Sequence, residues 1–362
     1  MFLNCGTFQM KPAEKKILVA PLNWGLGHAA RCIPLVRELM ANGFSPILAS
    51  DGAALELLRK EFPELPCHEL PSYNIEYPSD GKHLKWKLFA SLPRILKVVY
   101  HERSLIKKWV NDEGLCGVIS DNRFGVRDKR IPSVYITHQL TVLSGSTTWL
   151  TSFIHRLIIK KFDECWVPDM AGEQNLSGTL GHWNSNFPVR YIGPLTRMKK
   201  KELPPKYDIA IILSGPEPQR SIVERKLVEE FRDNPNKILL VRGVLNGERQ
   251  IGQNFNIVTY DYMTSSELED AINQSEVVIC RSGYSTMMDL SALGKKAFFI
   301  PTPGQYEQEY LAEKMKSEGY APYATQTEFN IEQLKELENY SGLPDIRTKT
   351  DWRTLFRLFE RK

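Results

Sequence analysis

The sequence predicts an α/β protein of two domains, each with a doubly wound parallel sheet, that face each other across a cleft. A chain of 362 residues, 42% hydrophobic and 25% charged, has enough apolar side chains for two cores. Short apolar runs bounded by turn residues alternate with segments of helical period, which is the pattern of βαβ units. A basic, proline-containing segment at 198–206 interrupts this alternation once, as an interdomain linker would, and the alternation then restarts.

Each predicted domain contains several buried strands. We expect a first domain at 15–197, which follows an N-terminal extension at 1–14 with no assigned role. Its predicted strands are 16–22, 45–51, 117–121 and 131–137, and its predicted helices are 31–42 and 84–111. We expect a second domain at 207–345 and a final helix at 346–362. The predicted strands of the second domain are 207–215, 237–243, 256–261, 277–283 and 296–301.

Composition narrows the class of function. Lys and Arg number 47 against 43 Asp and Glu, and this near balance does not indicate a nucleic-acid partner. The basic excess lies in the first half, which favours an anionic partner or an anionic membrane surface, although an ordinary solvated surface explains it as well. Six cysteines are scattered singly, so we expect reduced thiols, a cytoplasmic protein and no metal site. No run of about 20 apolar residues predicts a transmembrane span.

The first strand leads into a glycine-rich loop. Doubly wound sheets bind ligands at the carboxyl ends of their strands, so chemistry is expected in such loops. Gly25 and Gly27 allow a tight turn and a close approach to a ligand, and the following helix start attracts negative charge. The third glycine of a dinucleotide-binding fingerprint is missing. His28 stands where a general base is useful; the alternative is a helix-capping or core histidine.

Two further strand ends of the first half carry polar residues. Asp121 ends a strand at a position comparable to that of His28, where it could orient the histidine or act as the base itself. A helix or turn cap explains Asp121 equally well. His138 and Gln139 end the next strand and are weaker candidates for binding an acceptor.

Segment 280–294 is the most informative part of the second half. A buried strand runs into Ser282 and Gly283, and a helix then begins whose first turn presents Ser285, Thr286 and free backbone amides. This arrangement suits a phosphate group. Asp289 follows one turn later, where it could accept a hydrogen bond from a ribose hydroxyl. Simple helix capping by Ser and Thr is the alternative.

Two more loops should reach the same place. Ser214 and Gly215 are predicted at the start of a helix, and Gln305 and Gln308 precede or begin another. Three loops that converge on one point are harder to explain as caps than any one of them.

These residues carry a resemblance to a known family. Segment 261–321 resembles the nucleotide-sugar-binding half of the MurG-like glycosyltransferases of family 28, and segment 25–35 is similar to their glycine-rich loop ending in Gly-His. The resemblance implies the GT-B fold of two facing Rossmann-like domains. His28 corresponds to the loop histidine that faces the diphosphate or acceptor. The implied donor-site residues are Tyr260 near the uracil, Arg281, Ser282, Gly283, Ser285 and Thr286 around the diphosphate, Asp289 at the ribose and Gln308 at the sugar.

The sequence also departs from the family pattern. Asp289 is one methylene shorter than the family's Glu, Glu307 stands where a His is common, and Leu311 stands where an Asn is common. These differences leave the identity of the sugar and of the base open.

The resemblance implies a hexose or N-acetylhexosamine transferred from a nucleotide sugar, with UDP favoured, to a hydroxyl of a glycan or lipid-linked acceptor. The implied mechanism is an inverting displacement without metal or cofactor, because helix amides stabilise the leaving diphosphate and no DxD motif is present. Two alternatives remain. The same fold could hydrolyse or epimerise a nucleotide sugar, or the chain could bind one without catalysis.

Segment 82–109 is basic and rich in large apolar residues. One interpretation is an interfacial or acceptor-binding helix pair, hinged at Pro93, at the inner face of the cytoplasmic membrane. An amphipathic helix packed on the sheet is the favoured alternative.

Overall fold

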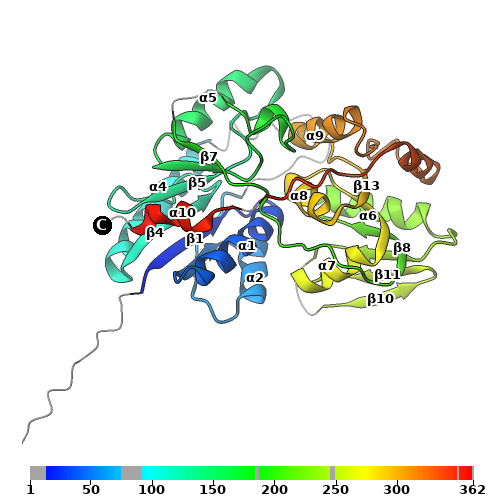
Figure 1. Cartoon of the computed structure of the whole chain (residues 1–362), viewed down its shortest axis with the longest axis horizontal. Coiled ribbons are helices and arrows are strands. Elements are labelled where there is room, and N and C mark those ends of the chain that lie inside the picture. The colour runs from blue at the N-terminus through cyan, green and yellow to red at the C-terminus, as the bar shows by residue number, and fades with distance from the viewer. Residues whose placement is uncertain (1–13, 75–91, 184–186, 245–248, 349, 361–362) are drawn as a thin grey trace, which may run out of the picture.

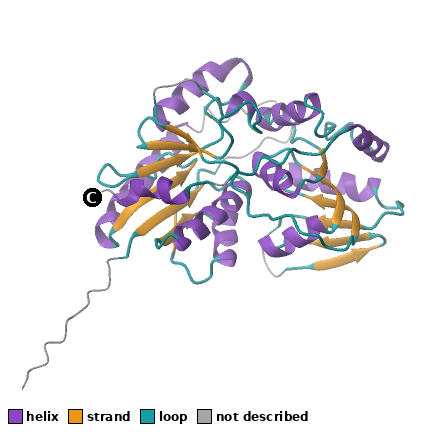
Figure 2. Ribbon diagram, viewed as in Figure 1, coloured by secondary structure: helices purple, strands orange, loops and turns teal. Residues whose placement is uncertain are grey.

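The computed structural model describes residues 14–74, 92–183, 187–244, 249–348 and 350–360. Two halves follow one another along the chain, each with a central sheet covered by helices (Figure 1). Figure 2 shows the two sheets with helices on both of their faces, which is the layering predicted for doubly wound domains. The predicted fold class is therefore confirmed.

The first sheet is entirely parallel and has the strand order β3-β2-β1-β4-β5-β6-β7. Its strands are β1 Lys16–Pro21, β2 Ser45–Ser50, β3 Cys67–Glu69, β4 Leu115–Asp121, β5 Ser133–Ile136, β6 Glu164–Val167 and β7 Val189–Tyr191. Its helices are α1 Gly27–Ala41, α2 Gly52–Glu61, α4 Leu92–Asp112 and α5 Thr148–Ile159, with 3-10 turns at Gly145–Thr147 and Gly178–Leu180. Strands β3, β6 and β7, of three or four residues each, were not predicted.

The second sheet has the order β10-β11-β9-β8-β12-β13, with β10 antiparallel to β11 and the other pairs parallel. Its strands are β8 Tyr207–Ile212, β9 Ile238–Val241, β10 Ile251–Asn254, β11 Ile257–Tyr260, β12 Ser275–Cys280 and β13 Lys296–Phe299. Its helices are α6 Gln219–Glu230, α7 Ser265–Asn273, α8 Tyr284–Leu293, α9 Tyr306–Ser317 and the 3-10 segment Ile331–Asn339. The five predicted strands and the predicted start of α8 match this list.

The end of the chain returns to the first domain. The predicted final helix at 346–362 is too long: residues 346–348 are not helical, and the last segment comprises α10, Trp352–Phe356, and the 3-10 turn Arg357–Glu360. Figure 1 shows this segment beside β1 and β4. The Phe356 ring lies 5.6 Å from the Phe44 ring, and Lys15 pairs with Glu360 at 2.9 Å. A side chain at Gly117 would collide with Phe359, so this glycine permits the close approach.

One local prediction stays open and another needs correction. Helix α4 begins at Leu92, so Pro93 lies in its first turn, where proline is tolerated, and the hinge at this residue stays a prediction. The preceding part of the predicted pair, 82–91, lies outside the described residues. Helix α4 buries Val98, Glu102, Ile106 and Trp109, as expected for an amphipathic helix on the sheet. Helix α6 begins only at Gln219, so Ser214 and Gly215 lie in the loop before it and not at its start.

Among the described residues, no helix combines the length and apolar character that crossing a membrane requires.

Candidate active site

The predicted base lies at the carboxyl edge of the first sheet. His28 is in the first turn of α1, since the helix begins at Gly27 and therefore earlier than predicted. Its Nδ1 lies 2.9 Å from Oδ1 of Asp121, the last residue of β4. The Asp121 side chain is fully buried, whereas His28 remains 15% exposed. The structure thus brings the two predicted catalytic residues together with the histidine on the solvent side.

Arg31 completes this site and was missed from the sequence. It lies one turn after His28, donates from Nε to Asp121 Oδ2 at 2.6 Å, and donates from Nη2 to Asp121 Oδ1. Burial by itself would raise the pKa of Asp121, but Arg31 and then His28 outweigh it and hold that pKa well below its usual range. An ionised carboxylate with both oxygens bonded suits orienting His28 better than accepting a proton. The sequence could have indicated Arg31, because residues at i and i+3 of a helix, such as His28 and Arg31, lie next to each other on one face.

A contact across the cleft joins this network to the second domain. His138 Nε2, just after β5, lies 2.7 Å from Oε1 of Glu307 in α9. Gln139 donates its side-chain amide to the other Glu307 oxygen. The His138 ring also stacks on Tyr284 of α8 with centroids 4.2 Å apart. His138 and Gln139, expected near the acceptor, therefore meet a second-domain carboxylate that sequence reasoning had noted only as a departure from the family.

Helix α8 presents its N-terminus to the base. The N-cap is Gly283, and the first turn contains no acidic residue to offset the partial positive charge of the helix start. Ser285 Oγ donates to the backbone oxygen of Gly27 at 3.0 Å, which places the two glycine-rich loops in direct contact. Thr286 lies beside Gly283. Backbone amides with flanking hydroxyls at a helix start can bind a diphosphate.

Other predicted donor residues are bonded within the second domain. The buried Ser282 hydroxyl donates to the Gln308 backbone oxygen at 2.7 Å, and it thus ties α8 to α9. Gln308 accepts from the Thr302 amide at 2.8 Å and donates to Gln305 Oε1 at 2.6 Å. These side chains hold the shape of the loops in this structure, so a ligand would meet mainly backbone groups here.

Arg281 is 1% exposed and lies beneath the loops. Its guanidinium donates to the Ile300 backbone oxygen at 2.9 Å and to Gln326 Oε1 at 2.6 Å. Burial lowers its pKa to about 10. The arrangement supports a role in holding the β12 and β13 strand ends together, and not the direct contact with substrate that the sequence suggested.

The remaining predicted residues lie around the same edge of the second sheet. Asp289 accepts from Thr196 Oγ1 at 2.7 Å, and its burial raises its pKa. Tyr260 ends β11, with the Arg249 guanidinium 5.2 Å from its ring centre. Gly215 has φ of +104°, a conformation that favours glycine, and it lies near Thr302. Ser214 precedes it in the same loop.

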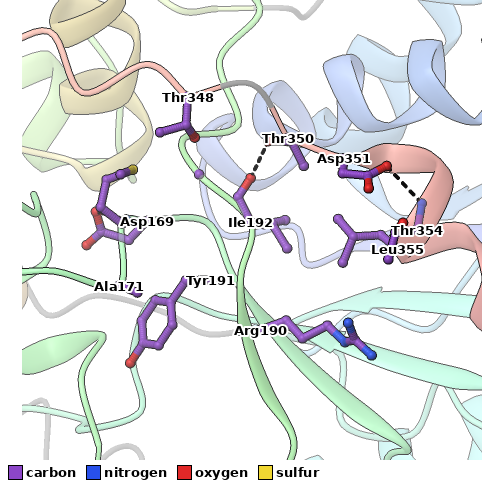
Figure 3. Close-up of a pocket in the computed structure, with 12 residues that line it drawn as sticks. Asp169, Ala171, Arg190, Tyr191, Ile192, Thr348, Thr350, Asp351, Thr354 and Leu355 are labelled. Carbon is purple, nitrogen blue, oxygen red and sulfur yellow. Dashed lines mark hydrogen bonds between the residues drawn. The ribbon is translucent and has the colours of Figure 1, made fainter.

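A separate cavity of about 500 Å³ lies between the end of β7 and the C-terminal segment (Figure 3). Its wall includes Asp169, Arg190, Tyr191, Thr350 and Asp351. None of the predicted site residues lines it, so it does not belong to the site described above.

Comparison with known proteins identifies the chemistry of this fold. Residues 215–339 match the glycosyltransferase family 28 C-terminal domain. An uncharacterized glycosyltransferase of Methanosarcina mazei is 27% identical, with 89% of each chain covered. The UDP-N-acetylglucosamine--N-acetylmuramyl-(pentapeptide) pyrophosphoryl-undecaprenol N-acetylglucosamine transferase of Haemophilus ducreyi is 24% identical, with 89% of this chain and 88% of that one covered.

Among solved structures, Acinetobacter baumannii MurG superposes with a TM-score of 0.56 at 12% identity, and the match covers 96% of this chain and 100% of that one. This likeness concerns the fold. Together with the sequence matches it shows a glycosyltransferase of the GT-B fold that is similar to MurG and whose residues 215–339 match the family 28 C-terminal domain.

Proposed function

We propose that the enzyme moves a hexose or N-acetylhexosamine from a nucleotide sugar to a hydroxyl of a glycan or lipid-linked acceptor, with inversion and without a metal. The observation that carries the proposal is the contact between the two loops. It brings the start of α1, which carries His28 backed by Asp121, against the start of α8, whose first turn has no acidic residue. A proton acceptor on one side of a cleft and an anion site on the other are the two parts that a displacement at an anomeric carbon needs.

The step follows from these two parts. His28 Nε2 takes the proton of the acceptor hydroxyl while that oxygen attacks the anomeric carbon from the face opposite the leaving group. The bond from the anomeric carbon to the diphosphate oxygen breaks, and the diphosphate leaves with the electron pair. Backbone amides at the start of α8 stabilise its charge. Asp121 remains ionised and stabilises the imidazolium that forms.

UDP is the favoured nucleotide, and the name of the Haemophilus ducreyi relative supports it. A thermal-shift series with UDP, GDP, dTDP, CMP and their sugars tests the donor, because a ligand that binds only the native state raises its melting temperature. We expect the largest shift with UDP or one UDP-sugar. Shifts without turnover on any acceptor would favour a binding protein, and slow release of free sugar would favour a hydrolase. No shift with any nucleotide would refute the proposal.

A contact with an anionic membrane surface is also part of the proposal. Helices α4 and α5 cover the same face of the first sheet. Helix α4 packs on Ala20, and His155 of α5 contacts Tyr135. Ala20 and Tyr135 are both paired with Ser120 on the strand between them, so their side chains point to the same face. The exposed apolar residues of these helices are Leu92, Leu96, Tyr100, Trp149, Leu150, Phe153, Ile154 and Leu157. We call this set the α4/α5 face.

The charges around the α4/α5 face support a lipid partner. Helix α5 contains no acidic residue, and Lys160 and Lys161 follow it as exposed cations. In α4 the basic residues are exposed, whereas Glu102 is buried and bonded to Arg123 at 2.7 Å, and the exposed acidic residue Asp112 is the last residue of the helix. Aromatic and aliphatic side chains with a basic rim suit the interface of an anionic bilayer. This contact would keep the enzyme at the inner face of the cytoplasmic membrane, beside a lipid-linked acceptor.

Flotation with vesicles containing anionic lipid tests this surface. We expect wild-type protein to float and the Trp149→Ser, Phe153→Ser double variant to remain in the dense fraction, since these two side chains are 73% and 56% exposed. The matched control is Ile251→Ser, which removes an apolar side chain that is 62% exposed on the second domain. No flotation of wild-type protein, or equal flotation of all three proteins, would remove the membrane surface from the proposal.

A further inference from the structure

A continuous chain of hydrogen-bonding side chains runs from the second domain to the predicted base. Glu307 Oε1 lies 2.7 Å from His138 Nε2, and His138 Nδ1 lies 2.9 Å from Arg31 Nη1. Arg31 in turn holds Asp121, whose Oδ1 lies 2.9 Å from His28 Nδ1. The base in the first domain is thus linked to a carboxylate that the second domain supplies.

The direction of each hydrogen bond follows from Arg31 and Asp121, because a guanidinium can only donate and an ionised carboxylate can only accept. His138 Nδ1 must therefore accept from Arg31, so His138 carries its proton on Nε2 and donates it to Glu307. Asp121 accepts from Arg31 Nε and Nη2, and it also accepts from His28 Nδ1. This assignment leaves a lone pair on His28 Nε2, which is the state that a general base needs.

A competing arrangement would disable the base. Arg31 Nη2 also lies 2.9 Å from His28 Nδ1. This distance already permits a hydrogen bond from the guanidinium to His28 Nδ1. If that bond replaced the one from His28 to Asp121, the proton of His28 would move to Nε2, and the side chain could no longer accept a proton there. The bond from Nη1 to His138 holds the guanidinium on Asp121. Arg31 is 1% exposed and Asp121 is not exposed, so water does not replace a lost bond at this point.

His138 is itself held from the second domain. Its ring stacks parallel to Tyr284, and the hydroxyl of Tyr284 donates to the Pro168 backbone oxygen at 2.9 Å. Glu307 is fixed by Gln139 as well as by His138. Burial by itself would raise the pKa of Glu307, but His138 outweighs it and the pKa falls, so the carboxylate is ionised and accepts.

We infer that Glu307 is a positioning residue for the base: through His138 and Arg31 it fixes the His28 tautomer that can take the acceptor's proton. The inference rests on the proposed function and deepens it. Because Glu307 comes from the second domain, this positioning of the base depends on the contact between the two domains.

Kinetics test the link. We expect Glu307→Ala and Glu307→Met to lower kcat about 10- to 100-fold, the usual range for coupling between sites, while Kd for UDP changes less than about twofold. Glu307→Gln should recover most of kcat, because its amide oxygen still accepts from His138 Nε2. The His138→Ala, Glu307→Ala double variant should be no slower than the slower single variant, since both act along one path.

The matched control is Tyr310→Phe. Tyr310 lies on the same helix as Glu307 and also crosses to the first domain, where its hydroxyl accepts from the Thr179 amide at 2.9 Å, but it does not reach Arg31. We expect wild-type kcat. An equal loss of kcat in Tyr310→Phe would show that Glu307 contributes only to domain contact and would overturn the inference.

Nitrogen-15 NMR of the histidine rings reads the tautomer directly, with the His28 signals assigned by their absence in His28→Ala. With UDP bound we expect the proton on Nδ1 in the wild-type protein and on Nε2 in Glu307→Ala. An unchanged tautomer, an unchanged kcat, or a kcat loss matched by loss of UDP affinity would each overturn the inference. If the wild-type protein turned over no nucleotide sugar, the proposed function would fail, and the tautomer would still decide the role of Glu307.

Discussion

The two domains have the same local arrangement on either side of the cleft: a buried strand is followed by a glycine and then by the start of a helix. Strand β1 leads through Gly25 into α1, and β12 leads through Gly283 into α8. Neither helix has an acidic residue in its first turn. The α1 start carries His28 and Arg31 on a buried carboxylate, whereas the α8 start carries hydroxyls. In the proposed mechanism the α1 start therefore serves proton transfer and the α8 start binds an anion, and their side chains make the difference.

Removal of the proposed base in the α1 start should have the largest effect on kcat. We expect His28→Ala to lower kcat about 10²- to 10⁴-fold, the usual contribution of a general base, and to leave Kd for UDP unchanged. Steady-state kinetics and calorimetry measure the two quantities. His182→Ala is the control, since that ring is bonded to backbone oxygens of the first domain away from the cleft. A kcat near that of wild-type enzyme would mean that the α1 start is only a capped helix.

A change at the other helix start should affect binding and not chemistry. We expect Thr286→Val to raise Kd for UDP about tenfold or more, because a lost hydrogen bond to a charged group costs about 1.5–3 kcal/mol. Thr286→Ser keeps the hydroxyl and should bind as the wild type does. If kcat at saturating donor fell while Kd stayed constant, the two helix starts would not divide the work as proposed.

Lowering the pH should reduce the free energy of unfolding, and we expect His138 of the first domain to contribute to this change. Burial lowers the pKa of His138, Arg31 adds to this, and Glu307 opposes it. The unfolded chain takes up this proton below about pH 6.5 and the folded chain only at lower pH, so the free energy of unfolding falls as pH falls through this window. The lowered pKa values of Asp121 and Glu307 also reduce the free energy of unfolding as the pH falls, but they do so at lower pH.

Urea unfolding across pH 4–8 measures this dependence. We expect His138→Gln to flatten the part of the curve near pH 6, and Thr286→Val to run parallel to the wild type, because the α8 start has no titrating group in its first turn. Parallel curves for wild type and His138→Gln would show that His138 does not contribute.

Removal of divalent metal ions with EDTA should have the smallest effect on kcat. Since helix amides and not a metal are proposed to stabilise the leaving diphosphate, we expect EDTA to leave kcat within error of the untreated enzyme. Loss of activity that magnesium restores would assign that charge to a metal, and the α8 start would then be only part of the anion site.

Local patterns in the sequence determined most of the described strands, the two glycine-containing loops and the limits of α8. Apolar runs and glycines act on their own neighbours, so Tyr284–Leu293 could be read directly from segment 280–294. The pairing of His28 with Asp121 could be proposed because both end or follow strands of one parallel sheet, which brings their side chains to one edge.

Only the tertiary structure decided which side chains meet over long separations. Glu307 lies 169 residues after His138, and Arg31 lies 90 residues before Asp121, and no periodicity links such positions. The same holds for the last helix, which packs on the first domain through Phe356 and Phe359. Burial of charged groups is stable only when every partner is present, and that condition is met by the packing of two domains and not by any one segment.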